Sequence, residues 1–326
     1  MNVLVTGGAG YVGSVCSEQL ISQGHHVVII DSLITGHRAA VPPGATFVQA
    51  DIAQSEIVTA LIKKHAIQAV MHFAGETLVT KSMTDPRCYF ENNLRKGITL
   101  LDTVMAQGVG QIIFSSTAAI FGEPEFTPIT ESHPTKPINA YGESKLMFEK
   151  VLSWYGRAYG LRHISVRYFN AAGASANFGE AHEPETHLIP LLLASAMDGV
   201  TEFKIYGDDY DTPDGTCVRD YVHVLDIAQA HIRALHALDQ GSSGVYNIGS
   251  ARGYSVREVL ETVKSVTGKE LRVNVAPRRA GDPAVLVADN AKLVTELGWN
   301  PQYSELEKII RSAWDWKLRH SRGYAD

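Results

Sequence analysis

Two side chains with complementary acid–base properties stand four residues apart in the segment Tyr141-Gly142-Glu143-Ser144-Lys145. On a helix, Tyr141 and Lys145 would share one face, with their Cβ atoms roughly 6 Å apart. A phenol, with a pKa near ~10, is a poor base at neutral pH, but a neighbouring ammonium favours the phenolate. Tyr141 is therefore a candidate general base and Lys145 its activator. The pattern is common by chance, and the alternative is an ordinary pair on a surface helix.

Hydroxyl side chains close the run Phe114-Ser115-Ser116-Thr117, whose apolar start predicts a strand. In an open parallel sheet, ligands lie beyond the carboxyl ends of the strands. We therefore expect Thr117 to reach the same crevice as Tyr141 and to hydrogen-bond the reacting oxygen.

Glycines at positions 7, 10 and 13 form the pattern G-x-x-G-x-x-G directly after an apolar run and at the start of a helical pattern. Gly7 and Gly10 permit a tight turn that brings backbone N–H groups to a pyrophosphate, and Gly13 lets the helix pack closely on the strand. The phosphates then meet the positive end of the helix dipole. We predict a dinucleotide-binding turn rather than a purely structural one.

An acidic residue, Asp31, ends the second apolar run, 18 residues beyond Gly13. There it can bind a ribose 2′-hydroxyl and repel a 2′-phosphate, which favours NAD over NADP. Arg38 is the one nearby cation that argues for NADP. We expect Asp51-Ile52 to meet the adenine, and the small residues of Phe73-Ala74-Gly75 to let the backbone approach the cofactor unless they form an ordinary turn.

The elements that must position these residues follow from hydrophobic periodicity. Nearly continuous apolar runs predict strands buried on both faces, at residues 3–5, 27–30, 69–71, 112–114 and 163–166. Helical patterns lie between them, at residues 11–23, 55–64 and 92–106. Strands alternating with helices predict an α/β fold with a Rossmann-type, doubly wound parallel sheet.

The regular alternation weakens after about residue 170, where the chain becomes rich in Gly, Pro, Asp and Glu. Further on, we predict a helix at 224–238, a strand at 244–248 that rejoins the main sheet, and a helix at 255–267. We therefore predict a dinucleotide-binding domain and a smaller α/β substrate-binding domain. Their ranges are residues 1–170 plus about 220–250 for the first, and about 171–219 and 251–326 for the second.

Composition limits the class of protein. The 326 residues are 45% hydrophobic and 20% charged, with a formal net charge of −6, which is typical of a globular chain and favours neither nucleic acid nor a membrane surface. No apolar stretch approaches the ~20 residues of a membrane span. Residues 1–6 already read as a strand, so we expect no signal peptide. Cys16, Cys88 and Cys217 are odd in number and far apart, which fits reduced thiols in the cytoplasm.

Other motifs occur in an order and spacing that are hard to obtain by chance. They are the segments DSLITGHR (31–38), HFAG (72–75), ENN (91–93), RYFN (167–170), GTCVRDYVHV (215–224) and APRRAGD (276–282). With the glycine turn, Thr117 and the Tyr141–Lys145 pair, they make the chain resemble the extended short-chain dehydrogenase/reductases. The resemblance is strongest to the branch that epimerises nucleotide sugars, and it covers essentially the whole chain.

This resemblance implies a reaction that converts UDP-galactose and UDP-glucose into one another. Tyr141 would take the proton of the sugar C4 hydroxyl while NAD accepts the C4 hydride. The 4-keto sugar would then turn over, and the hydride would return to its opposite face. The cofactor should stay bound, because no net redox change occurs. A homodimer is also expected from the family.

The resemblance also assigns site residues position by position. It places on the cofactor Gly7, Gly10, Tyr11, Val12, Gly13, Asp31, Ser32, Leu33, Ile34, Thr35, Gly36, Asp51, Ile52, Phe73, Ala74, Gly75, Glu76, Thr77, Asn92, Thr117, Tyr141, Lys145 and Phe169. It places on the substrate Thr117, Tyr141, Asn170, His187, Leu188, Lys204, Ile205, Tyr206, Arg219, Arg279 and Asp282. The two arginines suit a diphosphate, since guanidinium offers bidentate donors to phosphate, and Tyr206 can pack on uracil.

Two positions depart from the family pattern. His187 stands where other members carry Asn, although it still offers a hydrogen-bonding group. The position that governs access of N-acetylated sugars falls near Leu286, whose size is intermediate, so acceptance of UDP-N-acetylglucosamine is open.

The segment from His182 to His187 superficially resembles a zinc-protease helix. Its histidines are five residues apart instead of four, and Pro184 would break a helix, so they cannot share one helical face. We therefore expect no metal site.

Several other functions share parts of this pattern. A 4,6-dehydratase of the same fold needs an acid/base pair directly after the threonine, where this chain has Ala118-Ala119. A decarboxylase or a uronic-acid 4-epimerase shares the Tyr/Lys core and stays open. A non-catalytic NAD-sensing module would usually lack Tyr141 or Lys145, and a plain alcohol dehydrogenase would release its reduced cofactor in each turnover.

Overall fold

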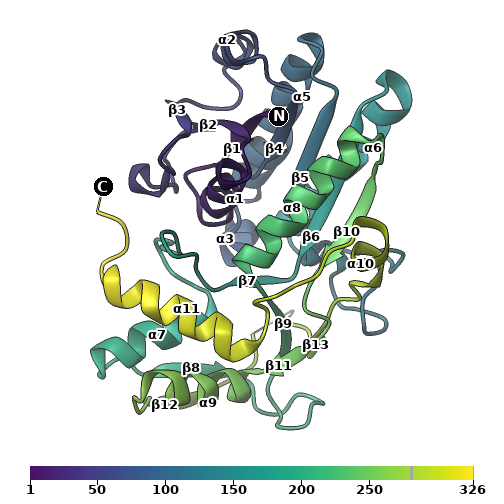
Figure 1. Cartoon of the computed structure of the whole chain (residues 1–326). Coiled ribbons are helices and arrows are strands. Elements are labelled where there is room, and N and C mark those ends of the chain that lie inside the picture. Colours follow the sequence, from purple (N-terminus) through teal and green to yellow (C-terminus); the bar gives the residue numbers. More distant parts are fainter. Residues whose placement is uncertain (280–281, 326) are drawn as a thin grey trace.

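The computed structural model describes residues 1–279 and 282–325. Its largest element is a seven-stranded sheet in which all neighbouring strands are parallel. From edge to edge its strands are β10 (Gly244–Ile248), β6 (Arg162–Tyr168), β5 (Gln111–Thr117), β4 (Ala69–His72), β1 (Asn2–Thr6), β2 (His26–Asp31) and β3 (Thr46–Gln49). The five apolar runs predicted as strands all lie in this sheet, and β10 rejoins it beside β6 as expected (Figure 1).

Helices cover both faces of this sheet, which is why its strands are apolar on both sides. Successive residues of β1 serve opposite faces: Val3 lies in a core with Leu20 and Leu235, and Leu4 lies in another with Leu101 and Phe148. The first face carries α1 (Tyr11–Ser22), α8 (Val224–Asp239) and α10 (Ala291–Leu297). The second carries α2 (Ser55–His65), α5 (Lys96–Ala106) and α6 (Ala140–Tyr159). The doubly wound fold is thus confirmed.

The helix predicted at 92–106 is not uniform. Its first part is η2 (Phe90–Arg95), a π-helical segment, and α5 follows it directly. π-Helical turns are rare and are frequently found at functional sites. This one contains the buried Asn93, whose contacts are described below.

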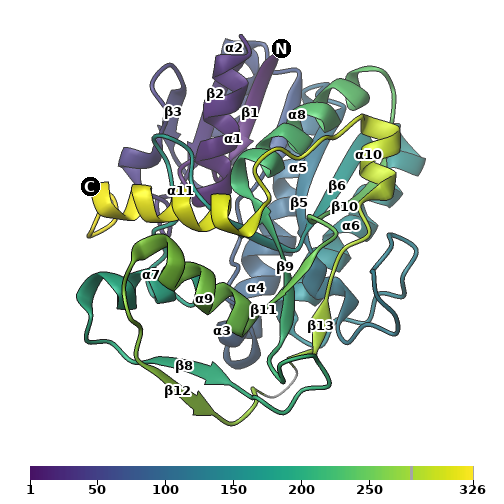
Figure 2. The same ribbon diagram turned by 60° about the horizontal axis from the view of Figure 1, so that its bottom comes forward.

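The smaller part of the molecule lies beyond the carboxyl ends of the large sheet (Figure 2). One of its sheets has the order β11 (Gly253–Ser255), β9 (Val218–His223) and β13 (Val285–Leu286), with β7 (Asn170–Ala172) also paired to β9. The other pairs β12 (Val273–Ala276) with β8 (Phe203–Tyr206). Their common core includes residues of α7 (Leu188–Asp198), α9 (Val256–Thr267) and α11 (Leu306–Arg319).

The chain crosses from the large-sheet part to the smaller part, and back, more often than the predicted domain ranges imply. Leu293 and Trp299, assigned to the smaller domain by sequence, are buried in the core of the large sheet. Strand β9 belongs to a small sheet, although most of it falls in the range assigned to the larger domain. The division into two domains therefore stays a prediction.

Short elements complete the architecture: η1 (Arg38–Ala40), α3 (Val79–Thr84), α4 (Pro86–Tyr89) and η3 (Ala118–Phe121). All three cysteines are free, as expected. Within the described part of the chain, none of the helices has the length and apolar character that crossing a membrane requires.

Candidate active site

The glycine turn joins the end of β1 to the start of α1, as predicted. Gly7 has φ +70°, and a Cβ there would lie 2.5 Å from the backbone nitrogen of Ala74, so glycine satisfies both the backbone and the space. Gly13 is packed as closely, but its partner differs from our expectation. A Cβ at Gly13 would lie 2.2 Å from the Gly7 carbonyl oxygen. The first turn of α1 therefore packs against the glycine turn itself and not against a strand.

The N-terminus of α1 is left open for an anion. Its N-cap, Gly10, makes no side-chain capping hydrogen bond, and no acidic residue stands in the first turn. Backbone N–H groups at a helix start lack helical partners, and the helix dipole adds positive potential there. The turn therefore fits the diphosphate of a dinucleotide.

Asp31 lies beside this turn, and its carboxylate has two roles. One oxygen accepts a hydrogen bond from the Ala9 N–H at 3.0 Å, and the other accepts one from the Leu33 N–H at 2.9 Å. The remaining lone pairs can bind ribose hydroxyls. Arg38, the cation that argued for NADP, lies 4.1 Å over the Phe47 ring and is not among the described residues that line the cleft. The geometry favours a ribose without a 2′-phosphate.

These elements border one large cleft of about 1320 Å³. Every predicted cofactor residue lines it except Leu33, whose backbone N–H holds Asp31. The lining set is Gly7, Gly10, Tyr11, Val12, Gly13, Asp31, Ser32, Ile34, Thr35, Gly36, Asp51, Ile52, Phe73, Ala74, Gly75, Glu76, Thr77, Asn92, Thr117, Tyr141, Lys145 and Phe169.

The candidate base lies in the first turn of α6. Asn139 starts this helix by accepting a hydrogen bond from the Gly142 N–H at 2.8 Å, and Tyr141 follows at the cleft. Lys145 comes one turn later and is only 2% exposed. Its ammonium donates to the Ser115 carbonyl oxygen at 2.9 Å, so strand β5 fixes the lysine behind the tyrosine.

Burial sets the acid–base properties of these groups. It raises the pKa of Tyr141, while a hydrogen bond with the Thr117 hydroxyl acts in the opposite direction. It lowers the pKa of Lys145 to about 8. Lys145 is therefore still mainly charged at neutral pH, and the phenol is protonated. For Tyr141 to act as a base, further positive charge must come close to it.

A buried asparagine that sequence reasoning missed joins the cofactor loop to this helix. Asn93 accepts from the Glu76 N–H at 2.7 Å, donates to the Glu76 carbonyl at 3.0 Å and donates to the Ser144 hydroxyl at 3.1 Å. Ser144 lies on α6 between the candidate base and its lysine. The sequence motif contains both Asn92 and Asn93, but only the π-helical geometry shows which one makes this link.

Asp51, expected near the adenine, has a cationic partner that sequence reasoning also missed. Lys96 contacts its carboxylate at 2.5 Å. Burial raises the pKa of Asp51, but hydrogen bonds from Lys96 and the Ala53 N–H outweigh this and lower it. Lys96 lines the same cleft.

Every predicted substrate residue lines the cleft as well. These are Thr117, Tyr141, Asn170, His187, Leu188, Lys204, Ile205, Tyr206, Arg219, Arg279 and Asp282, and Leu286 joins them. Ala280 and Gly281, which belong to the motif ending at Asp282, lie outside the described residues.

The two candidate diphosphate ligands differ in their partners. Arg219 forms an ion pair with Asp282 and donates to the Val218 carbonyl at 2.9 Å, so two predicted substrate residues hold each other. The Arg279 guanidinium lies 4.0 Å over the Tyr206 ring. Both guanidinium groups are thus oriented at the cleft wall before any ligand binds.

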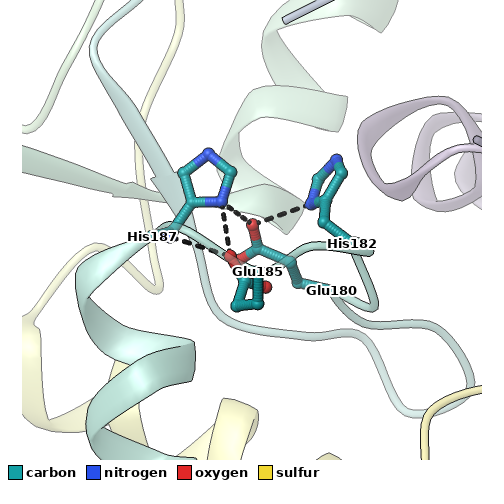
Figure 3. Close-up of side chains that lie close together, drawn as sticks. All are labelled: Glu180, His182, Glu185 and His187. Carbon is teal, nitrogen blue, oxygen red and sulfur yellow. Dashed lines mark hydrogen bonds and ion pairs between the residues drawn. The ribbon is translucent and has the colours of Figure 1, made fainter. Parts of the chain in front are cut away.

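The loop from Glu180 to His187 brings its histidines and glutamates together, which the sequence did not lead us to expect. On a helix, Pro184 and the spacing of the histidines would keep His182 and His187 apart. This segment forms no helix, and it turns so that one side-chain nitrogen or carboxylate oxygen of each of Glu180, His182, Glu185 and His187 lies within 4.8 Å of the others (Figure 3). The argument from helix spacing therefore does not apply to this loop.

Comparison with known proteins gives a consistent result. Residues 3–249 match the model of the NAD dependent epimerase/dehydratase family. The chain is 48% identical to a UDP-glucose 4-epimerase of Lacticaseibacillus casei, over 100% of this chain and 99% of that protein. A crystal structure of a UDP-glucose 4-epimerase has 45% identity and a TM-score of 0.97, with both chains fully covered.

A crystal structure of UDP-glucose 4-epimerase from Brucella ovis in complex with NAD is 43% identical, with a TM-score of 0.94 over 97% of this chain and 98% of that one. The family match covers most of the chain, and the likeness to these enzymes extends over essentially its whole length. The chain therefore belongs to the NAD-dependent epimerase/dehydratase family.

Proposed function

We propose that this chain interconverts UDP-galactose and UDP-glucose by oxidising and re-reducing the sugar at C4 with bound NAD. The observation that carries this proposal is the position of Tyr141, Thr117 and Lys145 in one cleft. That cleft runs from an open dinucleotide turn to a wall that carries two oriented arginines. Full-length similarity to UDP-glucose 4-epimerases, one of them solved with NAD, supports it.

The roles of the side chains follow from their chemistry. Tyr141 removes the proton of the C4 hydroxyl, and the Thr117 hydroxyl hydrogen-bonds the same oxygen. NAD, when bound, would supply the acceptor and later the donor of the C4 hydride, and its nicotinamide cation would add positive charge near the phenol. Tyr141 returns its proton to the C4 oxygen when the hydride comes back to the opposite face. The buried Lys145 ammonium favours the phenolate from the protein side. Arg219 and Arg279 hold the diphosphate while the sugar turns.

We further propose a division of labour in which the large sheet binds NAD and the smaller part binds the UDP-sugar, with the cofactor and substrate residues named above. A homodimer is supported by two aromatic side chains of α6, Trp154 and Tyr159, which are 65% and 68% exposed in the single chain. Light scattering at micromolar concentration tests the dimer. The three free thiols support a cytoplasmic location.

The decisive experiment uses purified protein and UDP-galactose with no added NAD. We expect UDP-glucose to appear, because the retained cofactor is regenerated in each turnover. A strict need for stoichiometric NAD, together with a ketone product, would contradict the proposal. UDP-glucuronic acid in the same assay tests the uronic-acid alternative. UDP-N-acetylglucosamine tests whether Leu286 leaves room for an N-acetyl group.

A further inference from the structure

One imidazole ring at the cleft is held by two carboxylates. The Nδ1 atom of His187 lies 2.8 Å from a carboxylate oxygen of Glu180 and 2.8 Å from one of Glu185. The same Glu180 oxygen also lies 3.1 Å from Nδ1 of His182. Two carboxylates on one ring nitrogen require a proton there and favour the doubly protonated, cationic ring.

The anchoring of Nδ1 fixes where the other nitrogen of the ring points. Nε2 of His187 lies on the far side of the ring, away from both carboxylates (Figure 3). Its side chain is 46% exposed and borders the cleft. A ring held in this way offers one charged N–H donor to a ligand in the cleft.

His187 is also the N-cap of α7, and its side chain makes no capping hydrogen bond. No acidic residue stands in the first turn of that helix. The Glu185 carboxylate lies just before this turn and accepts hydrogen bonds from the Thr186 and His187 N–H groups at 2.7 and 2.8 Å. The positive end of the α7 dipole therefore helps to hold Glu185 beside the imidazole. Leu188, the next residue, borders the cleft as well.

We propose that Glu180 is a positioning residue that, with Glu185, keeps His187 as an imidazolium whose Nε2 donates to the diphosphate of the UDP-sugar. This inference rests on the proposed function and extends it, since it gives a role to carboxylates outside the predicted site. Glu180 also borders the cleft, but in the proposed arrangement it acts through His187 and not on the sugar or the cofactor.

The titratable groups that face His187 are Glu180, Glu185 and His182, and the Tyr11 ring of α1 packs edge-on against His182 at 6.5 Å. Burial lowers the pKa of His187, but the two glutamates outweigh it and raise the pKa well above its usual value. The cationic ring therefore persists through neutral pH. Without the Glu180 charge, the pKa of His187 should fall toward neutrality, so the ring should lose its charge at a lower pH.

The test is the pH dependence of KM for UDP-galactose, measured on the enzyme with its retained cofactor between pH 6.5 and 8.5. We expect the KM of the unmodified protein to stay level across this range. In Glu180→Gln, the amide oxygen still accepts a hydrogen bond but the charge is gone. Its KM should rise roughly tenfold with pH as the charge-assisted bond is lost, while kcat keeps its pH profile.

Two further variants separate positioning from a structural role. His187→Asn should have a KM that stays level with pH, and adding Glu180→Gln to it should not create the pH response that Glu180→Gln shows alone. Glu183→Gln removes the same charge from the same loop without a contact to His187, and its KM should stay level with pH. A level KM in Glu180→Gln, or an unaltered response in the double variant, overturns the proposal.

Two measurements on the unmodified protein complete the design. Imidazole ¹⁵N NMR should show a doubly protonated His187 at pH 8, and a neutral ring overturns the proposal even if the variants fail to fold. This readout is independent of epimerase activity, so failure of the proposed function is distinguishable. If removing metals with EDTA raises KM and Zn²⁺ restores it, the loop holds a metal instead of the proton, and the proposal is wrong.

Discussion

The ammonium nitrogen of Lys145 and the carbonyl oxygen of Ser115 lie 2.9 Å apart and join α6 to the end of β5. Ser115 stands two residues before Thr117, so one hydrogen bond fixes the lysine in relation to the hydroxyl that contacts the candidate base. Because the lysine side chain is buried and hydrogen-bonded, its ammonium is held in one place near Tyr141 and Thr117.

Replacing Lys145 by methionine should slow turnover and shift its pH dependence. The change keeps the apolar volume but removes the charge that favours the phenolate, so we expect kcat to fall roughly 10²-fold or more. The pH at half-maximal kcat should also rise. The measurement is a kcat–pH profile with the NAD content of each preparation checked. A smaller kcat at an unchanged pH midpoint would show that Lys145 does not tune the base.

Tyr141→Phe removes the proposed base and leaves the ring in place. We expect kcat to fall by roughly 10²–10⁴, which is the usual contribution of general acid–base catalysis. Binding of UDP should stay within about twofold, because the phenol makes no contact with the diphosphate in the proposed pose. Calorimetry of UDP binding alongside the kinetics checks this. Near-normal turnover would mean that another group is the base.

Gly7→Ala and Gly24→Ala form a matched pair. Both positions have a left-handed backbone, with φ +70° and +81°, but only Gly7 would place its Cβ against another backbone atom, at 2.5 Å. Gly24→Ala should therefore cost only the backbone strain, about 1 kcal/mol. Gly7→Ala should cost at least ~3 kcal/mol and weaken NAD retention. Urea unfolding gives both values, and equal costs would rule out the close approach to Ala74.

Arg167 and Glu149 form a buried bidentate pair, with distances of 3.0 and 2.7 Å and side chains only 7% and 6% exposed. Glu149→Ala should lower the free energy of unfolding by ~3–5 kcal/mol, because it leaves a buried cation without a partner. The double variant Arg167→Met/Glu149→Leu should recover most of this loss. Both are measured by chemical unfolding, and a cost below about 1 kcal/mol for the single change would contradict this account.

His72 should make the fold sensitive to acid. Burial, helped by the Lys145 ammonium, lowers the pKa of His72 to about 3, and its Nδ1 lies 2.7 Å from the Thr6 hydroxyl. Between pH 6.5 and 3 the unfolded chain binds a proton here that the native protein does not. The free energy of unfolding therefore falls on acidification by up to ~1.4 kcal/mol per pH unit.

His72→Gln removes this titration, so its free energy of unfolding should depend less steeply on pH, by about one proton, than that of the unmodified protein. Identical slopes for the two proteins would show that His72 is protonated in the native state.

Much of the fold could be predicted from the sequence because its signals are local. The apolar runs identified strands, and Gly7, Gly10 and Gly13 marked the turn with its following helix. Strand ends such as Thr117 then reach the cleft by the general geometry of parallel sheets. The position of Leu33 was less predictable, because in this structure its side chain does not line the cleft and its backbone N–H serves Asp31.

Other features depend on contacts that no spacing rule expresses. Asn93 and Asn92 are adjacent in the sequence, and only a π-helical turn directs Asn93 to Glu76 and Ser144. The pairing of Asp51 with Lys96 spans 45 residues. The loop ending at His187 was judged by helix geometry, which does not govern an irregular segment.

The burial of Trp299 has a consequence for how the protein can be divided. Its indole N–H donates to the Asp226 carbonyl at 2.9 Å, and the Asp226 carboxylate accepts hydrogen bonds from Gln302, Tyr303 and Ser304. Residues 299–304 are therefore hydrogen-bonded to the first turn of α8, a helix that packs on the large sheet. A gene fragment that ends after β10 would lack Leu293 and Trp299 and would expose part of the core beside α8. The nucleotide-binding half should therefore not fold as an independent module for use in chimeric enzymes.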